Sequence, residues 1–176
     1  SKIFITNAGA ADVFIVFAMT DKEQGTRGIS AFILERDMPG FTMSKPENKM
    51  GLRASSTCEL VFDNVRIPKE NLLGQEGKGF KIAMATLDGG RIGVAAQAVG
   101  IAQGAIDEAV KYTTQRIQFG RRISQFQNTQ FTLADMQTRT DAARLLVWRA
   151  AAAEQNGEPY SHLAAMAKLY ASETAS

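Results

Sequence analysis

The sequence FKIAMATLDGGRIGVAAQAVGIAQGAIDEAVKYTTQRIQFG, residues 80–120, decides the fold of the C-terminal part of this 176-residue chain. Apolar and small side chains recur in it at intervals of three and four, which is the period of a helix with one buried face. The positions on this predicted face are Leu87, Arg91, Val94, Ala95, Ala98, Ala102, Ala105, Ile106, Ala109 and Val110. We therefore predict one long helix, closed by a turn at Gly120.

Glycines inside this helix need a cause, because each costs about 0.5 to 1 kcal/mol relative to alanine. There is a pair, Gly89-Gly90, and a small-residue row at helical spacing. The small-residue row consists of Gly93, Ala96, Gly100 and Gly104. We predict that a neighbouring helix approaches the backbone closely along this row.

Residues before the helix carry a different pattern. Four runs rich in Ile, Val and Phe are separated by polar or glycine-containing turns, as expected for strands. These runs are KIFITN at 2–7, DVFIVFAMT at 12–20, GISAFILER at 28–36 and TCELVFDNVRI at 57–67. They predict an antiparallel β domain over residues 1–73.

Residues after the long helix remain helical. A second helix is expected over residues 127–155, the sequence NGEP at 156–159 ends it, and a third helix begins near Tyr160. Because strands and helices are segregated along the chain, we predict an α+β fold rather than a parallel α/β sheet. The β domain, 1–73, is followed by part of an up-down helical bundle, 74–176.

Composition excludes several kinds of protein. Twenty basic and eighteen acidic residues leave a net charge of +2, and the basic residues are scattered, so neither nucleic acid nor a membrane surface is an expected partner. A single cysteine, Cys58, and a single histidine, His162, exclude a disulfide framework and a Cys/His zinc site, so no metal is expected. No apolar run reaches the roughly 18 residues that cross a bilayer. We expect a soluble protein in a reducing compartment.

Two groups of polar residues on the long helix have both a structural and a functional interpretation. Asp88 and Arg91 share one face beside the glycine pair and could pair with each other or grip an anionic ligand. Arg116, Gln118 and Phe119 place a charge, an amide and a ring at the far end of the helix, either as a solvated terminus or as a binding surface.

The run GQEGKG at 74–79 has the glycine content of a phosphate-binding loop. Its order, G-x-x-G-x-G with no following Lys-Ser/Thr, matches neither the dinucleotide nor the P-loop fingerprint. We interpret it as a flexible hinge between the two halves of the chain.

Essentially the whole chain resembles the middle and C-terminal regions of acyl-CoA dehydrogenases. The resemblance is carried by KIFITNAGAADVFIVFAMT at the start and by MGLRASSTCELVFDNVRIPKENLLGQEGKGF and the long helix further on. The run LDGGRIGVAAQAVGIAQGA is most similar to short-chain, butyryl-CoA-type members. The family fold consists of an N-terminal helical domain, a middle β domain and a C-terminal helical bundle, arranged as a dimer of dimers around FAD. The resemblance implies that this chain holds most of the β domain and the first part of the bundle.

The resemblance also implies roles for individual residues. Asp88 and Arg91 match the LDxxR positions that contact the CoA part of the substrate. Phe4, Ile5 and Thr6 match the segment that lies against the flavin, where the family usually has Trp in place of Phe4 and where the threonine hydroxyl reaches N5. The positions that match the segment reaching FAD of a neighbouring subunit are Arg116, Gln118, Phe119 and Gln127, with Arg116 toward the pyrophosphate.

The implied reaction is α,β-dehydrogenation of a fatty acyl-CoA, with electrons passed to electron transfer flavoprotein. The family's catalytic glutamate belongs to a Tyr-Glu-Gly-Thr segment that these residues do not contain, so we expect no activity from them alone. The implied location is bacterial cytoplasm, or mitochondrial matrix in a eukaryote. Two alternatives stay open: an acyl-CoA oxidase-like flavoenzyme that hands electrons to oxygen, and a non-catalytic scaffold with this fold.

Overall fold

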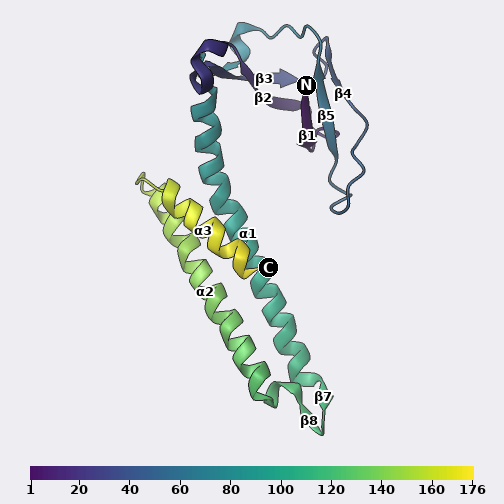
Figure 1. Ribbon diagram of the computed structural model, residues 1–176, viewed down its shortest axis with the longest axis vertical. Coiled ribbons are helices and arrows are strands. Elements are labelled where there is room, and N and C mark those ends of the chain that lie inside the picture. Colours follow the sequence, from purple (N-terminus) through teal and green to yellow (C-terminus); the bar gives the residue numbers. More distant parts are fainter. The chain divides into compact units, whose positions relative to one another are not determined.

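The computed structural model describes residues 1–176 and divides into two compact units, Ser1–Ala83 and Met84–Ser176 (Figure 1). Apart from a short hairpin at 117–122, the strands lie in the first unit, and most of the helical residues lie in the second, as an α+β fold requires. The division falls just inside the first long helix, further along the chain than residue 73, and the domain boundary expected there stays a prediction.

Two three-stranded antiparallel sheets make up the first unit. One contains β1 (Lys2–Thr6), β5 (Thr57–Phe62) and β4 (Phe41–Met43), and the other contains β2 (Val13–Met19), β3 (Ile29–Glu35) and β6 (Leu72–Leu73). The four predicted strands are confirmed. The sequence did not reveal β4 and β6, because runs of three and two residues are too short for an alternating pattern to stand out.

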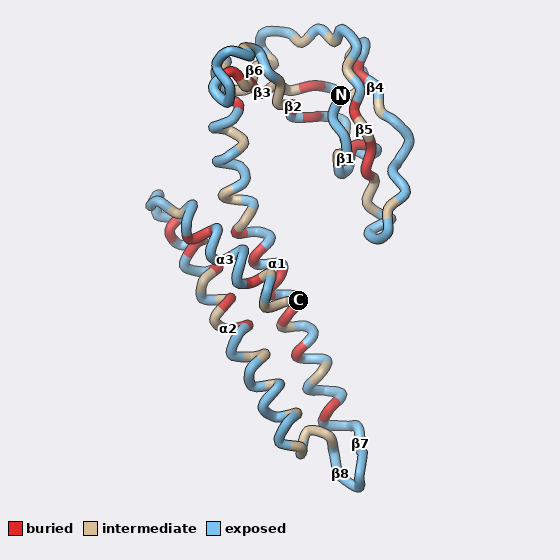
Figure 2. Tube along the Cα trace, in the orientation of Figure 1, coloured by how far each residue is buried: buried red, intermediate tan, exposed pale blue.

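Alternation of side chains along β2 builds the core of this unit. Phe14 and Val16 are buried while Val13 and Ile15 are exposed, which is the period of two that a strand with one covered face requires (Figure 2). The buried cluster consists of Ala8, Phe14, Val16, Leu34, Phe41, Cys58 and Leu60. Cys58 is therefore a core residue.

The run at 74–79 is anchored to β3, so its interpretation as a flexible hinge is wrong. The backbone N–H of Gly77 donates to the buried Ser30 hydroxyl at 2.8 Å. A Cβ added to Gly79 would lie 2.5 Å from the Ser30 carbonyl carbon. Gly79 leaves room for β3, whereas Gly77 leaves room for the Arg27 carbonyl just before β3. At Gly74 and Gly77 φ is positive as well.

Three helices make up most of the second unit: α1 (Gly79–Gln115), α2 (Gln127–Gln155) and α3 (Ser161–Thr174). The bounds of α2 agree with the sequence prediction. Gly157 stands just beyond its end with φ 71°, the left-handed conformation that closes many helices. None of the helices combines the length and the apolar character needed to cross a lipid bilayer.

The buried side of α1 agrees with the predicted one in part, because Ala95, Ala98, Ala102 and Ile106 are buried as expected. Leu87 and Val94 are each 50% exposed, whereas Ile92 and Val99 are buried against α2 and α3. The prediction was wrong at Leu87 and Val94, because alanines and glycines occur on several sides of α1 and allow more than one stripe at the same period. The core of this unit consists of Ile92, Ala95, Ala98, Val99, Ala143, Val147, Ala150, Ala153, Leu163, Ala164, Ala167 and Ala171.

The small-residue row lies on the exposed side of α1. A Cβ added to Gly93, Gly100 or Gly104 would meet nothing within 4 Å. No helix of this chain therefore packs against the row, and the close approach of a neighbouring helix stays a prediction.

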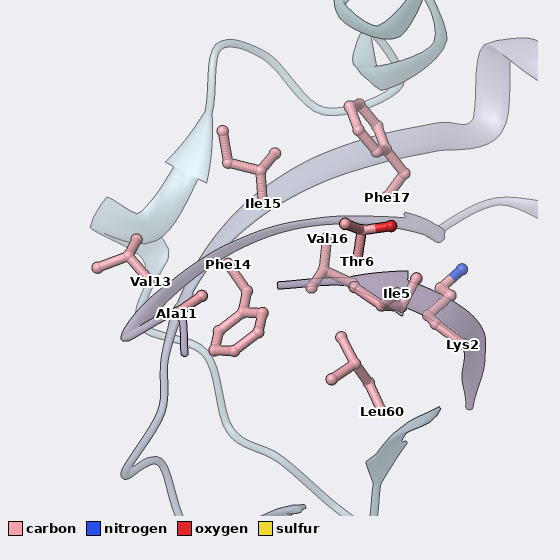
Figure 3. A pocket seen from close by; sticks show the side chains of 10 residues that line it. All are labelled: Lys2, Ile5, Thr6, Ala11, Val13, Phe14, Ile15, Val16, Phe17 and Leu60. Carbon is pink, nitrogen blue, oxygen red and sulfur yellow. The ribbon is translucent and has the colours of Figure 1, made fainter. Parts of the chain in front are cut away.

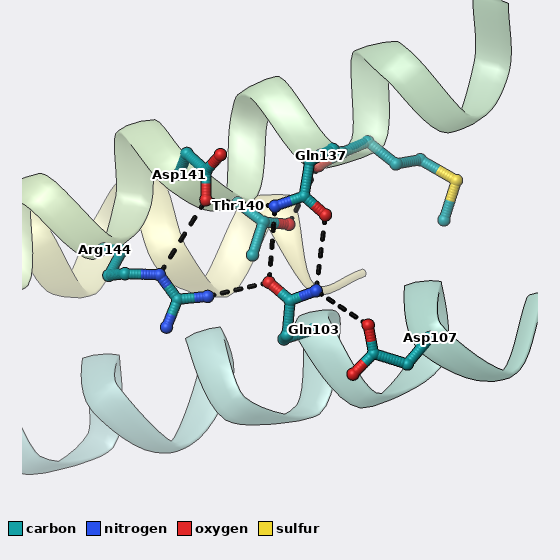
Figure 4. A network of polar contacts seen from close by, with 7 residues as sticks. Gln103, Asp107, Gln137, Thr140, Asp141 and Arg144 are labelled. Carbon is teal, nitrogen blue, oxygen red and sulfur yellow. Dashed lines mark hydrogen bonds and ion pairs between the residues drawn. The ribbon is translucent and has the colours of Figure 1, made fainter. Parts of the chain in front are cut away.

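A polar network joins α1 to α2 further along (Figure 4). The side chains of Gln103 and Gln137 hydrogen-bond each other, and the Arg144 guanidinium donates to the side-chain amide oxygen Oε1 of Gln103 at 2.7 Å. Asp107 and Asp141 accept the remaining amide protons at 3.0 Å each. Since the network needs these positions opposite one another, it favours one register between the two helices.

Candidate functional site

Phe4 lies at an irregularity in β1. Pairing with β5 shifts between Lys2 and Ile5, and Phe4 between them has φ 56°. A left-handed conformation costs a non-glycine residue roughly 1 to 2 kcal/mol, and bulges commonly redirect a side chain. Here the Phe4 ring is 66% exposed, so the strained backbone presents an aromatic face to the surface.

Ile5 and Thr6 line a cavity of about 330 Å³ in the same unit (Figure 3). The lining residues are Lys2, Ile5, Thr6, Ala11, Val13, Phe14, Ile15, Val16, Phe17 and Leu60. Phe4 is not among them. Sequence reasoning found the β1 residues but missed those of β2, which look like ordinary strand residues until the two strands are placed side by side.

Asp88 and Arg91 form an ion pair, with 2.6 Å between Asp88 Oδ1 and Arg91 Nη1. The first of the two local interpretations is thus correct, and the second is compatible with it, because the pair lines an open cavity of about 660 Å³. The other lining residues belong to the turn before α3 and to its start: Gly157, Glu158, Pro159, Tyr160, Ser161, His162 and Ala165. The Arg91 side chain is 40% exposed, so its guanidinium can also reach a ligand.

Glu154 of α2 explains the first glycine of the Gly89-Gly90 pair. Its Oε1 lies 3.3 Å from the position of a Cβ on Gly89, tighter than most contacts of that kind. A Cβ on Gly90 would meet nothing within 4 Å. Next to the ion pair, the backbone of α1 is therefore open at Gly90, whereas Glu154 lies against Gly89.

Tyr160 lines this cavity together with Asp88. Partial burial, the charge of Glu154, a hydrogen bond to the Glu154 side chain and the charge of Asp88 all raise the pKa of the Tyr160 phenol above 10.0. The hydroxyl is thus a proton donor throughout the physiological range. Sequence reasoning passed over Tyr160, because it marked only the start of a helix.

A β-hairpin follows α1, where the sequence predicted helix as far as Gly120. Strands β7 (Ile117–Gln118) and β8 (Arg121–Arg122) are joined by Phe119 and Gly120, with φ 52° and 77°. Two positive φ values in a two-residue loop are the pattern of a type I′ turn. This turn prefers Asn-Gly, so a phenylalanine at its first position hid the hairpin.

The hairpin displays the residues expected to meet a cofactor. Phe119 is 92% exposed, and its ring lies 6.3 Å from that of Phe126, edge to face. Arg116 and Gln118 are exposed beside it, and Gln127 begins α2. Arg116 pairs with no carboxylate of the chain, so it can receive an anion. These groups fit a ligand that joins phosphates to flat rings, as FAD does.

The residues expected to bind substrate or cofactor lie in three separate groups. The structure brings Asp88 and Arg91 together at one cavity, and Arg116, Gln118 and Phe119 together on the hairpin. Arg116 directly follows the end of α1, and 24 residues of that helix lie between it and Arg91, which at about 1.5 Å per residue is on the order of 37 Å. The third group, Phe4, Ile5 and Thr6, lies in the first unit.

Two protein families together match nearly the whole chain. The family described as acyl-CoA dehydrogenase, middle domain, matches residues 1–65, and the one described as acyl-CoA dehydrogenase, C-terminal domain, matches residues 77–176. The chain belongs to the acyl-CoA dehydrogenase family.

Similar proteins from several sources support this membership. The short-chain specific acyl-CoA dehydrogenase of Megasphaera elsdenii is 61% identical over 99% of this chain and 46% of its own length. The acryloyl-CoA reductase (NADH) of Anaerotignum propionicum is 54% identical over 99% and 44%. The mitochondrial short-chain specific acyl-CoA dehydrogenase of Rattus norvegicus is 54% identical over 99% and 42%. Relatives are thus both bacterial and mitochondrial, and the chain spans about half the length of those it matches.

Solved structures share the fold over 98% of the chain. Butyryl-CoA dehydrogenase from Megasphaera elsdenii has a TM-score of 0.94 at 60% identity, with 45% of that chain covered. A structure of the electron transferring flavoprotein of Acidaminococcus fermentans contains a chain with a TM-score of 0.93 at 63% identity, 46% covered. PigA with FAD and proline has a TM-score of 0.94 at 35% identity, 45% covered.

Proposed function

We propose that the protein containing this chain oxidises short-chain acyl-CoA thioesters to trans-2-enoyl-CoA with FAD and passes the electrons to an electron transfer flavoprotein. One observation carries the proposal. The Asp88–Arg91 pair, at the LDxxR positions of the family, lines an open cavity in a chain 61% identical to a short-chain specific acyl-CoA dehydrogenase.

In this proposal the cavity beside α1 receives the CoA part of the substrate. Arg91 offers N–H donors to carbonyl or phosphate oxygens, and Asp88 holds the guanidinium in place while accepting from an amide or hydroxyl. The backbone at Gly90, where an added Cβ would meet nothing within 4 Å, leaves room for a ligand to lie close to the helix.

FAD would be held by the exposed residues of β1 and of the hairpin. Bound FAD supplies the acceptor for the hydride that leaves the β-carbon. The Thr6 hydroxyl is suited to donate to the flavin ring, and the ring of Phe4 keeps a stacking surface without an indole donor. Arg116 would pair with the pyrophosphate, Gln118 and Gln127 would add amide contacts, and Phe119 would stack on a ring.

The hairpin also supports an oligomeric enzyme. A ring that is 92% exposed at the tip of a two-residue turn is typical of a residue that another surface covers. We propose that the hairpin reaches FAD of a second copy in a homotetramer, a dimer of dimers. We propose bacterial cytoplasm or the mitochondrial matrix as its location, and the existence of bacterial and mitochondrial relatives supports this.

The experiment is anaerobic titration of the purified full-length protein with acyl-CoA thioesters from C4 to C16. We expect the flavin absorbance to bleach most readily with C4, and a clear preference for C8 or longer would contradict the short-chain assignment. Reoxidation by electron transfer flavoprotein should be faster than reoxidation by air. The opposite order would favour an oxidase.

Replacing Arg91 tests directly whether the cavity beside α1 binds the substrate. In the full-length enzyme, Arg91→Gln should lower kcat/KM for butyryl-CoA by about tenfold or more, because charge-assisted hydrogen bonds contribute about 1.5 to 3 kcal/mol. Arg139→Gln is the matched control, since Arg139 also pairs with an aspartate of its own helix but lies outside this cavity. Equal losses in both variants would refute the assignment of the cavity.

A second candidate is the reverse reaction. The similarity to an acryloyl-CoA reductase, 54% identical over 99% of this chain, favours it. Incubating the full-length protein and an electron transfer flavoprotein with acryloyl-CoA and NADH distinguishes the two. Net NADH consumption faster than butyryl-CoA oxidation would make reduction the main activity.

A further inference from the structure

The ring of Phe126 contacts two residues of the hairpin formed by β7 and β8. The Phe119 ring lies edge to face with it, with the ring centroids 6.3 Å apart and an angle of 88° between the planes. The guanidinium carbon of Arg121 lies 4.1 Å from the centroid of the Phe126 ring, which is the distance of a cation–π interaction. One side chain thus joins the tip of the hairpin and its second strand.

The backbone holds Phe126 on both sides. Its N–H donates to the Ile123 carbonyl at 3.1 Å, and its own carbonyl accepts from the N–H of Gln130 in α2 at 3.1 Å. The Phe126 ring is half-buried, whereas the Phe119 ring is 92% exposed and stacks on no other aromatic side chain. The contact with Phe126 is therefore left to orient the Phe119 ring.

Arg121 lies on the same face of the hairpin as Gln118. The two residues pair directly across β7 and β8, and directly paired residues of an antiparallel ladder share one face. Arg121 is exposed and forms no ion pair, and residues 116–122 contain three arginines and no acidic residue. A cation–π contact uses the flat face of the guanidinium, so the N–H groups at its edge stay available for phosphate oxygens.

We propose that Phe126 is a positioning residue for FAD binding: its ring holds the Phe119 ring and the Arg121 guanidinium together, where a ligand with flat rings and phosphates meets both. This inference rests on the proposed function. Phe126 acts through these two side chains and need not touch the cofactor. Removing its aromatic ring should therefore weaken FAD binding although Phe119 and Arg121 are both still present.

The test measures FAD binding to the full-length apoprotein by fluorescence titration. Phe126→Leu keeps an apolar side chain, and we expect the Kd for FAD to rise about fivefold to tenfold, because one aromatic pair and one cation–π contact are lost. Phe126→Tyr keeps both contacts and should stay within about twofold of wild type. The matched control is Phe131→Leu, an exposed phenylalanine of α2 that contacts neither Phe119 nor Arg121 through its ring, and it should also stay within about twofold.

A second comparison distinguishes positioning from a general effect on α2. When Phe119→Leu and Arg121→Gln are already present, adding Phe126→Leu should change the Kd by less than about twofold, since no side chain is left to position. A further loss as large as the one in the wild-type background would overturn the proposal, as would an unchanged Kd in Phe126→Leu alone. Phe126→Met replaces Phe126→Leu if thermal unfolding shows that the leucine variant does not fold.

A crystal structure of full-length Phe126→Leu without FAD gives a readout that needs neither activity nor cofactor. The Phe119 ring and the Arg121 guanidinium should leave the positions that they have in wild type. Retention of both positions would overturn the role of Phe126. If the wild-type apoprotein binds no FAD, the proposed function fails, while this structure still decides whether Phe126 positions the two side chains.

Discussion

Single residues in unusual backbone conformations mark the candidate cofactor surface. Phe4 and Phe119 both have positive φ, and both rings are more than half exposed. Neither feature helps folding, because the conformation is strained and the exposed ring gains little burial. Strain retained at two exposed aromatic residues is what a surface shaped for a ligand would show.

Phe119→Asn should separate stability from binding. Asparagine adopts the left-handed region readily, so in the full-length protein we expect the free energy of unfolding to rise by about 0.5 to 1 kcal/mol. FAD affinity should fall, since the ring is lost. Urea unfolding and fluorescence titration of the apoprotein measure the two effects. Phe131→Asn, an exposed phenylalanine within α2, is a control that should not be stabilised. A variant that binds FAD as wild type does would contradict the stacking role.

Ionisation of Tyr160 should be visible at high pH. Because its folded-state pKa is raised above the unfolded value of 10.0, the native state holds this proton more tightly. The resulting stabilisation is fully present below pH 10.0 and is lost as pH rises through the folded-state pKa. The tyrosinate absorbance of full-length wild type minus that of Tyr160→Phe should show a midpoint above pH 10.0. A midpoint below that value would contradict the environment described for Tyr160.

Whole elements depend on glycine where backbones meet. The start of α1 lies so close to β3 that no side chain fits at Gly79, and Gly77 donates to Ser30 from the same segment. Elsewhere in α1 the glycines are open, and only Gly89 is close to another side chain. Glycines that look alike in the sequence therefore have different causes.

Gly79→Ala should destabilise the full-length protein by about 1 to 3 kcal/mol, because the added methyl group would overlap the backbone of Ser30. Gly51→Ala serves as the control, since a Cβ there meets nothing within 4 Å, and its effect should stay within about 0.5 kcal/mol. Thermal unfolding compares the two variants. Equal melting temperatures would show that the backbone of β3 can shift at this contact with little loss of stability.

On the scale of the whole molecule, the exposed side of α1 is the main unexplained surface. Val94 and Ile101, one heptad apart, are 50% and 60% exposed beside the small-residue row. Apolar side chains next to glycines suit a closely packed helix better than water. In the complete enzyme we expect a helix, from the same subunit or another, to cover this side.

The change in folding stability when Gly100 is replaced shows whether another helix covers this side of α1. On an open helix, Gly100→Ala should stabilise by about 1 kcal/mol through helix propensity alone. Under a close neighbour it should destabilise, and Gly100→Leu should do so by more. We expect both substitutions to destabilise the full-length protein. Thermal unfolding measures the change in stability, and sedimentation measures whether the assembly is kept. A gain in stability with both substitutions would mean that the surface is open.

The sequence by itself determined the segregation of strands from helices, the four longer strands, the bounds of α2 and the family. The first three features follow from local periodicity, and the family follows from stretches that match the sequences of its members. Neither needs knowledge of which residues contact one another in the fold. The tertiary structure decided which side of α1 is buried, that 74–79 is anchored on β3, and that a strained hairpin follows Gln115. It also placed Tyr160 at the cavity that Asp88 and Arg91 line. Except for the hairpin, whose unusual turn residue hid it, these features depend on contacts between residues far apart in the chain, about which local propensity carries no information.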